Sequence, residues 1–228
     1  MIRFRIALLL LFLNCPLGFA AWLVQELSII NCQFSMAQTF TAQPVPDSVF
    51  QRMKGRSYPH DCTIPRSDLR YLRLSHVDAD GREHVGEMVC NKAIAQDILD
   101  IFRELYRQKY PIERIRLIDD YDASDERSMR DNNTSSFCFR KVSGTTKLSK
   151  HALGMAVDVN TLYNPYVRTG KDGRRIVEPS TAVKYVDRTR SFPYKIVKGD
   201  LLHRLFLQHG FQWGGSWRTM KDWQHFEK

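Results

Sequence analysis

The sequence lacks the motifs that mark the commonest metal sites of proteins. Its 228 residues include five cysteines, and no two of them stand in the CxxC spacing of a structural zinc site. The HExxH motif, which places two histidines and a glutamate on one helix, is also absent. These absences argue against a cysteine-rich structural zinc site and against a thermolysin-type zinc centre.

Patterns of nucleic-acid and calcium binding are lacking as well. No basic run is interleaved with aromatic residues, as binding of single-stranded nucleic acid requires, so no nucleic-acid partner is expected. The acidic stretch 119–126 holds five carboxylates but no calcium-ligand pattern with its spacing glycine. We interpret this stretch as a solvated loop.

Basic residues outnumber acidic ones, 34 to 25, which gives a formal net charge of +9. This excess is consistent with a basic solvated surface or with an acidic partner, and a cell-wall polymer that carries free carboxylates would be a natural electrostatic partner. Hydrophobic residues at 43% and charged residues at 26% are ordinary globular values. We therefore expect a packed core.

The N-terminus carries a long uncharged run. Residues 6–24 contain no charged side chain and follow a short basic region, which is typical of a secretory signal peptide or of an uncleaved membrane anchor. Asn14 and Pro16 interrupt the run and favour cleavage, after Ala20 or Ala37. The protein is therefore expected to be exported to the periplasm or cell envelope, with possible membrane association through this segment.

The length of the chain suits one domain with a sizeable core. We interpret 1–37 as the signal peptide or membrane anchor, 38–60 as a polar spacer with two prolines, and 61–228 as the domain. Export would permit disulfides. The domain has an odd number of cysteines, so at least one thiol stays free, and the sequence does not assign a pair among Cys62, Cys90 and Cys138.

Hydrophobic periodicity predicts both strands and helices in this domain. Strands are expected over 68–76, 84–90 and 115–118, and helices over 91–110 and from the capping residue Asp200 to Gly210. The segment 163–179 is rich in Gly, Pro, Arg and Tyr and is interpreted as a surface loop that walls a substrate cleft. His76 and His84, which flank the turn of the first hairpin, are interpreted as exposed.

The stretch 149–160 combines a histidine with a carboxylate seven residues later, in a run of small and apolar residues. If a strand begins at Gly154, Asp158 lies on the face opposite the apolar core residues. A carboxylate at the edge of a packed sheet needs a partner, and a metal ion is one of the few that offset its burial. Together with His151 and His225, Asp158 would complete the two-histidine, one-carboxylate ligand set of a catalytic zinc site.

The pattern Ser149-x-His151-x-x-Gly154-x-Ala156-x-Asp158, followed downstream by Asp222-x-x-His225, resembles the D-alanyl-D-alanine carboxypeptidase family of zinc peptidases. That family includes the VanY-type carboxypeptidases and the L-alanyl-D-glutamate endolysins. The similarity extends from about Tyr71 to the C-terminus and takes in the fragments 133–140 and 210–215.

The resemblance implies roles for three further residues. Asp222 would be the general base that takes a proton from the attacking water and delivers it to the leaving amine, after a turn near Trp223 has brought it beside His225. Many members of the family carry glutamate at this position. Because aspartate is one methylene group shorter, its reach to the attacking water is the open question. Arg140 would stabilise the oxyanion and hold substrate. Ser149 would fix the His151 loop through its hydroxyl group.

The resemblance also implies an α+β fold of the hedgehog/DD-peptidase type, in which an antiparallel sheet has helices on one side and zinc lies in a cleft. The implied function is a zinc peptidase that acts on peptidoglycan stem peptides, with D-Ala-D-Ala carboxypeptidase as first choice. An L-Ala-D-Glu endopeptidase and a non-catalytic wall-binding module on the same fold are the alternatives. The cleaved bond and the oligomeric state are left open.

Overall fold

The computed structural model describes residues 38–142 and 145–228, and a folded unit begins at Thr39. The expected signal peptide or membrane anchor over 1–37 lies outside the described residues. Within the part that the structure describes, no helix has the length and apolar character needed to cross a membrane.

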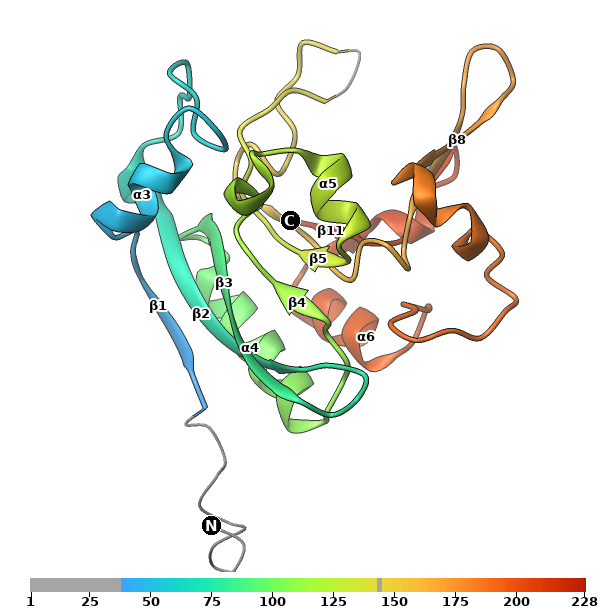
Figure 1. The fold of residues 1–228 in the computed structure, drawn as a ribbon, viewed down its shortest axis with the longest axis horizontal. Coiled ribbons are helices and arrows are strands. Elements are labelled where there is room, and N and C mark those ends of the chain that lie inside the picture. Colours follow the sequence, from blue (N-terminus) through green and yellow to red (C-terminus); the bar gives the residue numbers. More distant parts are fainter. Residues whose placement is uncertain (1–37, 143–144) are drawn as a thin grey trace, which may run out of the picture. The chain divides into compact units, whose positions relative to one another are not determined.

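A three-stranded antiparallel sheet forms the N-terminal half of this unit (Figure 1). Its order is β1 (Phe40–Pro44), β2 (Leu69–Val77) and β3 (Glu83–Asn91), and β2 and β3 are joined by a turn. The two long strands confirm the predicted hairpin, because their alternating apolar residues allow each strand to bury one face.

Helix α4 (Ala95–Arg107) packs against β2. Ile98, Phe102 and Leu105 repeat at intervals of three and four and are buried together with Leu72 and Leu74 of the sheet. The predicted helix over 91–110 is thus confirmed in its central part. A turn precedes it, and the chain leaves the helix before Pro111.

The interpretation of 38–60 as a spacer is wrong. Strand β1 pairs with β2 along its whole length, and helix α3 (Asp47–Met53) follows it. Val45, Val49 and Met53 are buried against Tyr71, on the sheet face away from α4. Val49 and Met53, four residues apart, lie on one face of this short helix, and Val45 packs with them from the chain just before it, so these residues belong to the folded unit. Helices therefore cover both faces of this sheet rather than one.

The acidic stretch is structured rather than a solvated loop. It contains the 3₁₀-helix η2 (Ile118–Tyr121) and the start of α5 (Asp125–Arg130), and Asp119 is buried. The carboxylate of Asp119 accepts hydrogen bonds of 3.0 Å from both the backbone N–H and the hydroxyl group of Ser57. Burial raises the pKa of Asp119, and these donors oppose that rise.

Two short strands flank η2 and α5. β4 (Arg114–Ile115) runs parallel to β5 (Asn133–Thr134), so the strand predicted over 115–118 is shorter than expected. After β5, residues 136–140 do not form a regular strand, and Phe137 among them is buried.

The C-terminal half contains two further three-stranded sheets. One has the order β6 (Ala156–Asp158), β11 (His225–Glu227) and β9 (Gln212–Trp213). The other has the order β10 (Met220–Asp222), β7 (Tyr166–Thr169) and β8 (Arg175–Glu178). The segment 163–179, expected to be a loop, is therefore largely a hairpin that pairs with β10.

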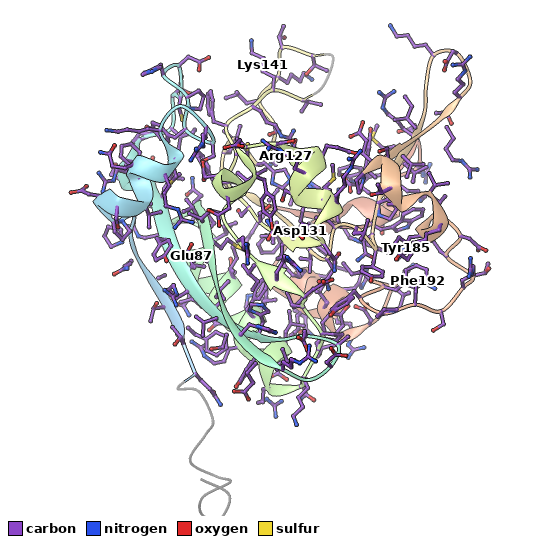
Figure 2. All side chains as sticks on the ribbon, viewed as in Figure 1. Glu87, Arg127, Asp131, Lys141, Tyr185 and Phe192 are labelled. Carbon is purple, nitrogen blue, oxygen red and sulfur yellow. The ribbon has the colours of Figure 1, made fainter. Side chains whose placement is uncertain are left out.

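Helices and aromatic side chains support these sheets. The predicted C-terminal helix is confirmed as α6 (Leu201–Gln208), whose N-cap Asp200 accepts a hydrogen bond of 2.8 Å from the backbone N–H of His203. After β8, the 3₁₀-helix η3 (Ser180–Tyr185) leads into an aromatic cluster that includes Tyr185 and Phe192 (Figure 2).

The mixture of helices with mainly antiparallel sheets agrees with the expected α+β class. The larger core cluster joins residues of β2, β3 and α4 to Val157, Phe206 and Phe226 of the C-terminal half. The strands β6 and β11 are thereby anchored on the same core as the N-terminal sheet. Cys62, Cys90 and Cys138 are all free thiols.

Candidate metal centre

Strand register brings Asp158 and His225 together. In the antiparallel pair of β6 and β11, these two residues lie directly opposite each other. Their neighbours Val157 and Phe226 are also paired and are fully buried. Because side chains alternate along a strand, burial of the apolar pair turns Asp158 and His225 to the other face.

The turn before β6 supplies His151. The hydroxyl group of Ser149 accepts a hydrogen bond of 3.0 Å from the backbone N–H of Ala152, so it ties down the loop that carries the histidine. The Nδ1 of His151 lies 2.7 Å from the carbonyl oxygen of Ser136. Since a carbonyl oxygen only accepts, Nδ1 carries the proton and the lone pair of Nε2 faces the site.

Three side chains meet at one point. The Nε2 of His151 lies 3.1 Å from Oδ2 of Asp158, and the Nδ1 of His225 lies 2.9 Å from Oδ1 of the same carboxylate. The two imidazole nitrogens are 3.1 Å apart. The ligand atoms of these three residues all lie within 4.8 Å of one another.

Glu227 fixes the orientation of His225. Its carboxylate oxygen Oε2 lies 3.0 Å from Nε2 of His225, two residues away on the same strand. The Nε2–H therefore points to Glu227, and Nδ1 is the nitrogen that faces Asp158 and His151. Such a carboxylate behind a ligating histidine is typical of zinc sites. Glu227 lies on the same strand face as His225, and this i, i+2 spacing is the signal that could have identified it from the sequence.

The donor set fits a divalent metal ion such as zinc. Two imidazole nitrogens whose outer N–H groups are both engaged present lone pairs to each other, and only a proton or a cation satisfies both. Burial lowers the pKa of His225, but its hydrogen bonds to Asp158 and Glu227 outweigh burial and raise that pKa to about 10. Burial acts against ionisation of Asp158, yet the two histidines hold its pKa well below the usual range. The site is thus built to hold positive charge.

Asp222, the last residue of β10, lies next to this cluster although β10 belongs to the other sheet. A bend at Trp223 and Gln224 separates β10 from β11, as the sequence predicted, so Asp222 is free of the alternation that governs His225. Its Oδ1 is buried without a hydrogen-bond partner among the described residues. Burial raises the pKa of Asp222 to about 7; His225 opposes this rise and Asp158 adds to it. A buried carboxylate oxygen with a free lone pair is suited to accept a proton from water.

The close approach of η4 (Gly214–Ser216) shapes the wall behind Asp222. A Cβ atom on Gly214 would lie 2.7 Å from the backbone oxygen and 2.8 Å from the Cβ of Asp222, and 3.3 Å from the Cβ of His225. Only glycine leaves room for this packing. The Trp213-Gly214-Gly215 segment therefore has a spatial role at the site.

Arg140 is held by a residue that the sequence did not point to. Its Nε lies 2.6 Å from Oδ2 of Asp125, in α5. Burial raises the pKa of Asp125, while Arg140 and, more weakly, His151 lower it, which places this ion pair within electrostatic reach of the candidate ligands. Asp125 was assigned to a solvated loop, and no local pattern links it to Arg140 fifteen positions later.

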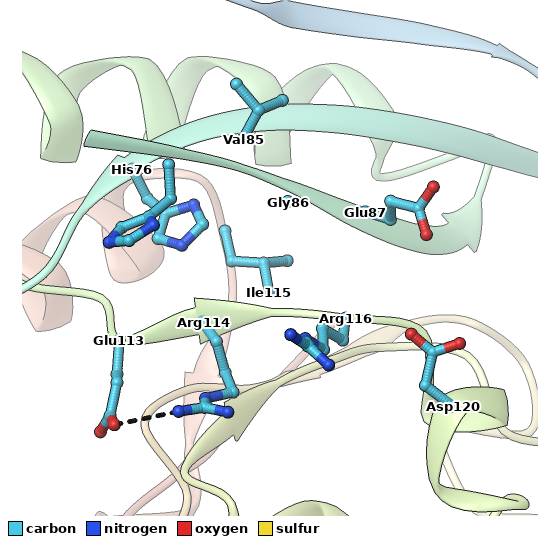
Figure 3. Close-up of a pocket in the computed structure, with 10 residues that line it drawn as sticks. His76, Val85, Gly86, Glu87, Glu113, Arg114, Ile115, Arg116 and Asp120 are labelled. Carbon is cyan, nitrogen blue, oxygen red and sulfur yellow. Dashed lines mark hydrogen bonds and ion pairs between the residues drawn. The ribbon is translucent and has the colours of Figure 1, made fainter. Parts of the chain in front are cut away.

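A separate groove of about 370 Å³ runs along β3 and the segment that carries β4 (Figure 3). It includes none of the three candidate ligands. His76, which was expected to be exposed, is buried at one end and stacks on His84 with ring centroids 5.3 Å apart. The lining carboxylates are already engaged in hydrogen bonds or ion pairs, which involve Glu87, Glu113 and Asp120.

Two imidazoles and a carboxylate around one point define a candidate mononuclear metal centre. Residues 143–228 match the family model described as D-alanyl-D-alanine carboxypeptidase, a family of zinc peptidases. The resemblance drawn from the motifs is confirmed over this range, which contains Ser149, the three candidate ligands and Asp222. Arg140 lies outside the matched range, and the similarity from Tyr71 to residue 142 stays a prediction. No curated protein and no solved structure gives a significant match to the chain.

Proposed function

We propose that this protein is a zinc-dependent peptidase that hydrolyses peptidoglycan stem peptides, with terminal D-Ala-D-Ala as its substrate bond. The observation that carries the proposal is the meeting of His151, Asp158 and His225 within a segment that matches the peptidase family. These three side chains would hold the ion.

Zinc bound there would lower the pKa of a water molecule and polarise the scissile carbonyl group. The chain's own residues do the rest. Asp222 takes a proton from the attacking water and delivers it to the leaving amine. The guanidinium group of Arg140, oriented by Asp125, stabilises the negative charge on the carbonyl oxygen. Ser149 ties down the loop that carries His151, and Glu227 keeps the ring of His225 facing the site.

Two alternatives remain distinct from this proposal. An L-Ala-D-Glu endopeptidase would use the same ligands and the same base, and it differs only in how the substrate is held on either side. A non-catalytic wall-binding module would need neither Asp222 nor Arg140. The unpartnered carboxylate oxygen of Asp222 beside the ligands favours an enzyme over a module.

The proposed location is the periplasm or cell envelope, with membrane association where the N-terminal segment is retained. Support comes from the uncharged run 6–24 and from the net charge of +9, since the substrate polymer carries carboxylates.

Digestion of purified peptidoglycan tests the proposal. The purified protein, with one equivalent of zinc added, is expected to release D-alanine from pentapeptide stems, seen by mass spectrometry, and a chelator should abolish the release. Release of peptides with a new N-terminal D-glutamate would instead support the endopeptidase. Binding of peptidoglycan without any product would support the module.

A further inference from the structure

The sheet β10–β7–β8 presents one face to the metal centre. Asp222 of β10 is paired with Tyr166 of β7, and Tyr166 is paired with Glu178 of β8. Directly paired residues of antiparallel strands project to the same face. Because Asp222 faces the candidate ligands, Tyr166 and Glu178 share the face that borders the site.

Arg168 lies on this face as well. It is two residues beyond Tyr166 on β7 and is paired with Met220 of β10, so it is a diagonal neighbour of Asp222. Diagonal neighbours in a sheet lie about 7–8 Å apart, which the long arginine side chain spans. Burial raises the pKa of Tyr166, Arg168 lowers it, and Asp222 and Glu178 raise it, which agrees with all four side chains meeting on one face.

Arg168 is half-buried, and no hydrogen bond or ion pair within 38–142 and 145–228 engages its guanidinium group. Three other cations near the site are already engaged. Arg140 is paired with Asp125, Lys221 donates to the carbonyl oxygens of Gly215 and Trp217, and Arg188 donates to three backbone carbonyl oxygens and to a side-chain amide. Arg168 is thus a cation of this sheet face that is available to an anionic ligand.

The proposed role of Asp222 indicates which part of a bound substrate would lie near Arg168. A general base that returns its proton to the leaving amine marks the side of the leaving group. In a carboxypeptidase the leaving group is the C-terminal amino acid, whose own carboxylate follows within one residue length, about 3.8 Å between Cα atoms. A free cation beside Asp222 is therefore placed for that carboxylate.

We propose that Arg168 binds the free α-carboxylate of the C-terminal residue of the substrate and so selects carboxypeptidase over endopeptidase cleavage. The inference rests on the proposed function and assigns a specificity-determining residue to it. The planar guanidinium group matches a carboxylate with two parallel hydrogen bonds. Glu178, the other diagonal neighbour of Arg168, repels a substrate anion and confines it to the side of Arg168 and the metal.

The test compares one stem peptide in two forms, with a free C-terminal carboxylate and with a C-terminal amide. The native protein should bind and cleave the free acid in preference to the amide. Arg168→Gln should lower kcat/KM for the free acid roughly 10- to 100-fold, the scale of a lost charge-assisted hydrogen bond, mainly through KM. The amide should be unaffected, and zinc content should stay unchanged.

Arg175→Gln is the matched control. Arg175 lies on the same hairpin, but it is paired with Thr169 and therefore projects from the opposite face. This control removes the same charge from the hairpin and should leave the preference for the free acid intact. Glu178→Gln should strengthen binding of the free acid, because it removes a repulsive charge.

Calorimetric measurement of the binding of both peptides to the metal-free protein distinguishes a failure of the carboxylate site from a failure of the proposed activity. Preference for the free acid that depends on Arg168, without any cleavage by the zinc-loaded protein, would support the carboxylate site and reject the proposed activity. Equal binding of acid and amide by the native protein, or equal losses on both in Arg168→Gln, would overturn the role of Arg168 whether or not the protein is a peptidase.

Discussion

At the scale of single residues, the metal centre depends on what each histidine does with its second nitrogen. The carbonyl oxygen of Ser136 fixes the tautomer of His151, and Glu227 fixes that of His225. The lone pairs of both rings consequently converge on Asp158. These contacts orient the three candidate ligands toward one another, which would reduce the reorganisation that binding of an ion requires.

The first prediction separates the base from the ligands. Asp222→Asn should retain about one zinc per chain and lose turnover on the order of 10² or more, because the amide keeps the shape but no longer accepts a proton. Asp158→Asn should lose zinc itself, since a neutral amide is a poor ligand. Metal analysis and muropeptide turnover on the same samples measure both effects. A zinc-loaded Asp222→Asn protein with a near-native rate would reject the role of Asp222.

The second prediction concerns Glu227. Glu227→Ala should weaken zinc binding roughly 10- to 100-fold, because His225 loses the acceptor that orients its ring. Glu227→Gln, whose amide oxygen still accepts a hydrogen bond, should weaken it less. Competition with a chromophoric chelator measures the affinities. Identical affinity in the native protein and in Glu227→Ala would show that the ring is held by other contacts.

At the scale of elements, the site is assembled where η4 presses on β10 and β11. Gly214→Ala should destabilise the fold by roughly 1–3 kcal/mol and lower the zinc affinity, because the added methyl group meets the backbone of Asp222 rather than a movable side chain. Denaturant unfolding and zinc titration measure the two effects.

Gly170→Ala is the control for this prediction. There the new methyl group would meet the carboxylate tip of Asp172, an exposed side chain that can rotate away at the cost of its hydrogen bond from the backbone N–H of Arg174, so stability should change by about 1 kcal/mol or less. Equal behaviour of the two variants would contradict the spatial role of Gly214.

A further prediction concerns His76 of the β2–β3 hairpin and the dependence of the protein's stability on pH. Burial lowers the pKa of His76 to about 4, below its ordinary value of about 6.5. The unfolded chain therefore binds the proton first, so the contribution of His76 is fully present above about pH 6.5 and is lost as pH falls toward 4.

Between about pH 7 and pH 5 this loss should be on the order of 1–2 kcal/mol. His76→Gln should show a correspondingly smaller difference in the free energy of unfolding between these two pH values, whereas His84→Gln, at a partly exposed position, should resemble the native protein. Denaturant titrations at both pH values provide the measurement. If His76→Gln lost as much stability between these two pH values as the native protein, the acid sensitivity would come from other groups.

At the scale of the whole molecule, the N-terminal boundary of the folded unit is the testable feature. A protein that starts at Gln38 should fold and remain soluble, because the unit begins at Thr39. A protein that starts at Ser57 lacks β1 and α3 and exposes Tyr71 and Val89. Loss of Val45, Val49 and Met53 from the core, at about 1.5–3 kcal/mol for each buried side chain, should unfold much of it. Equal melting temperatures of the proteins that start at Gln38 and at Ser57 would support the interpretation of 38–60 as a spacer.

The sequence alone determined the long elements and the ligand candidates. The β2–β3 hairpin, α4 and α6 follow from apolar periodicity and capping residues, which are local properties of the chain. The short spacing from His151 to Asp158 and the motif Asp222-x-x-His225 were enough for the family resemblance, which the match over 143–228 confirms.

Tertiary structure alone decided which distant side chains meet. The engagement of Arg140 by Asp125, the placement of Arg168 beside Asp222 and the burial of Asp119 depend on strand register and helix docking. The strands β7 and β8 were missed because strands of four residues are too short to show a periodicity of their own. They form because β10 offers a hydrogen-bonding edge, and such pairing energy between remote segments leaves no local trace in a sequence.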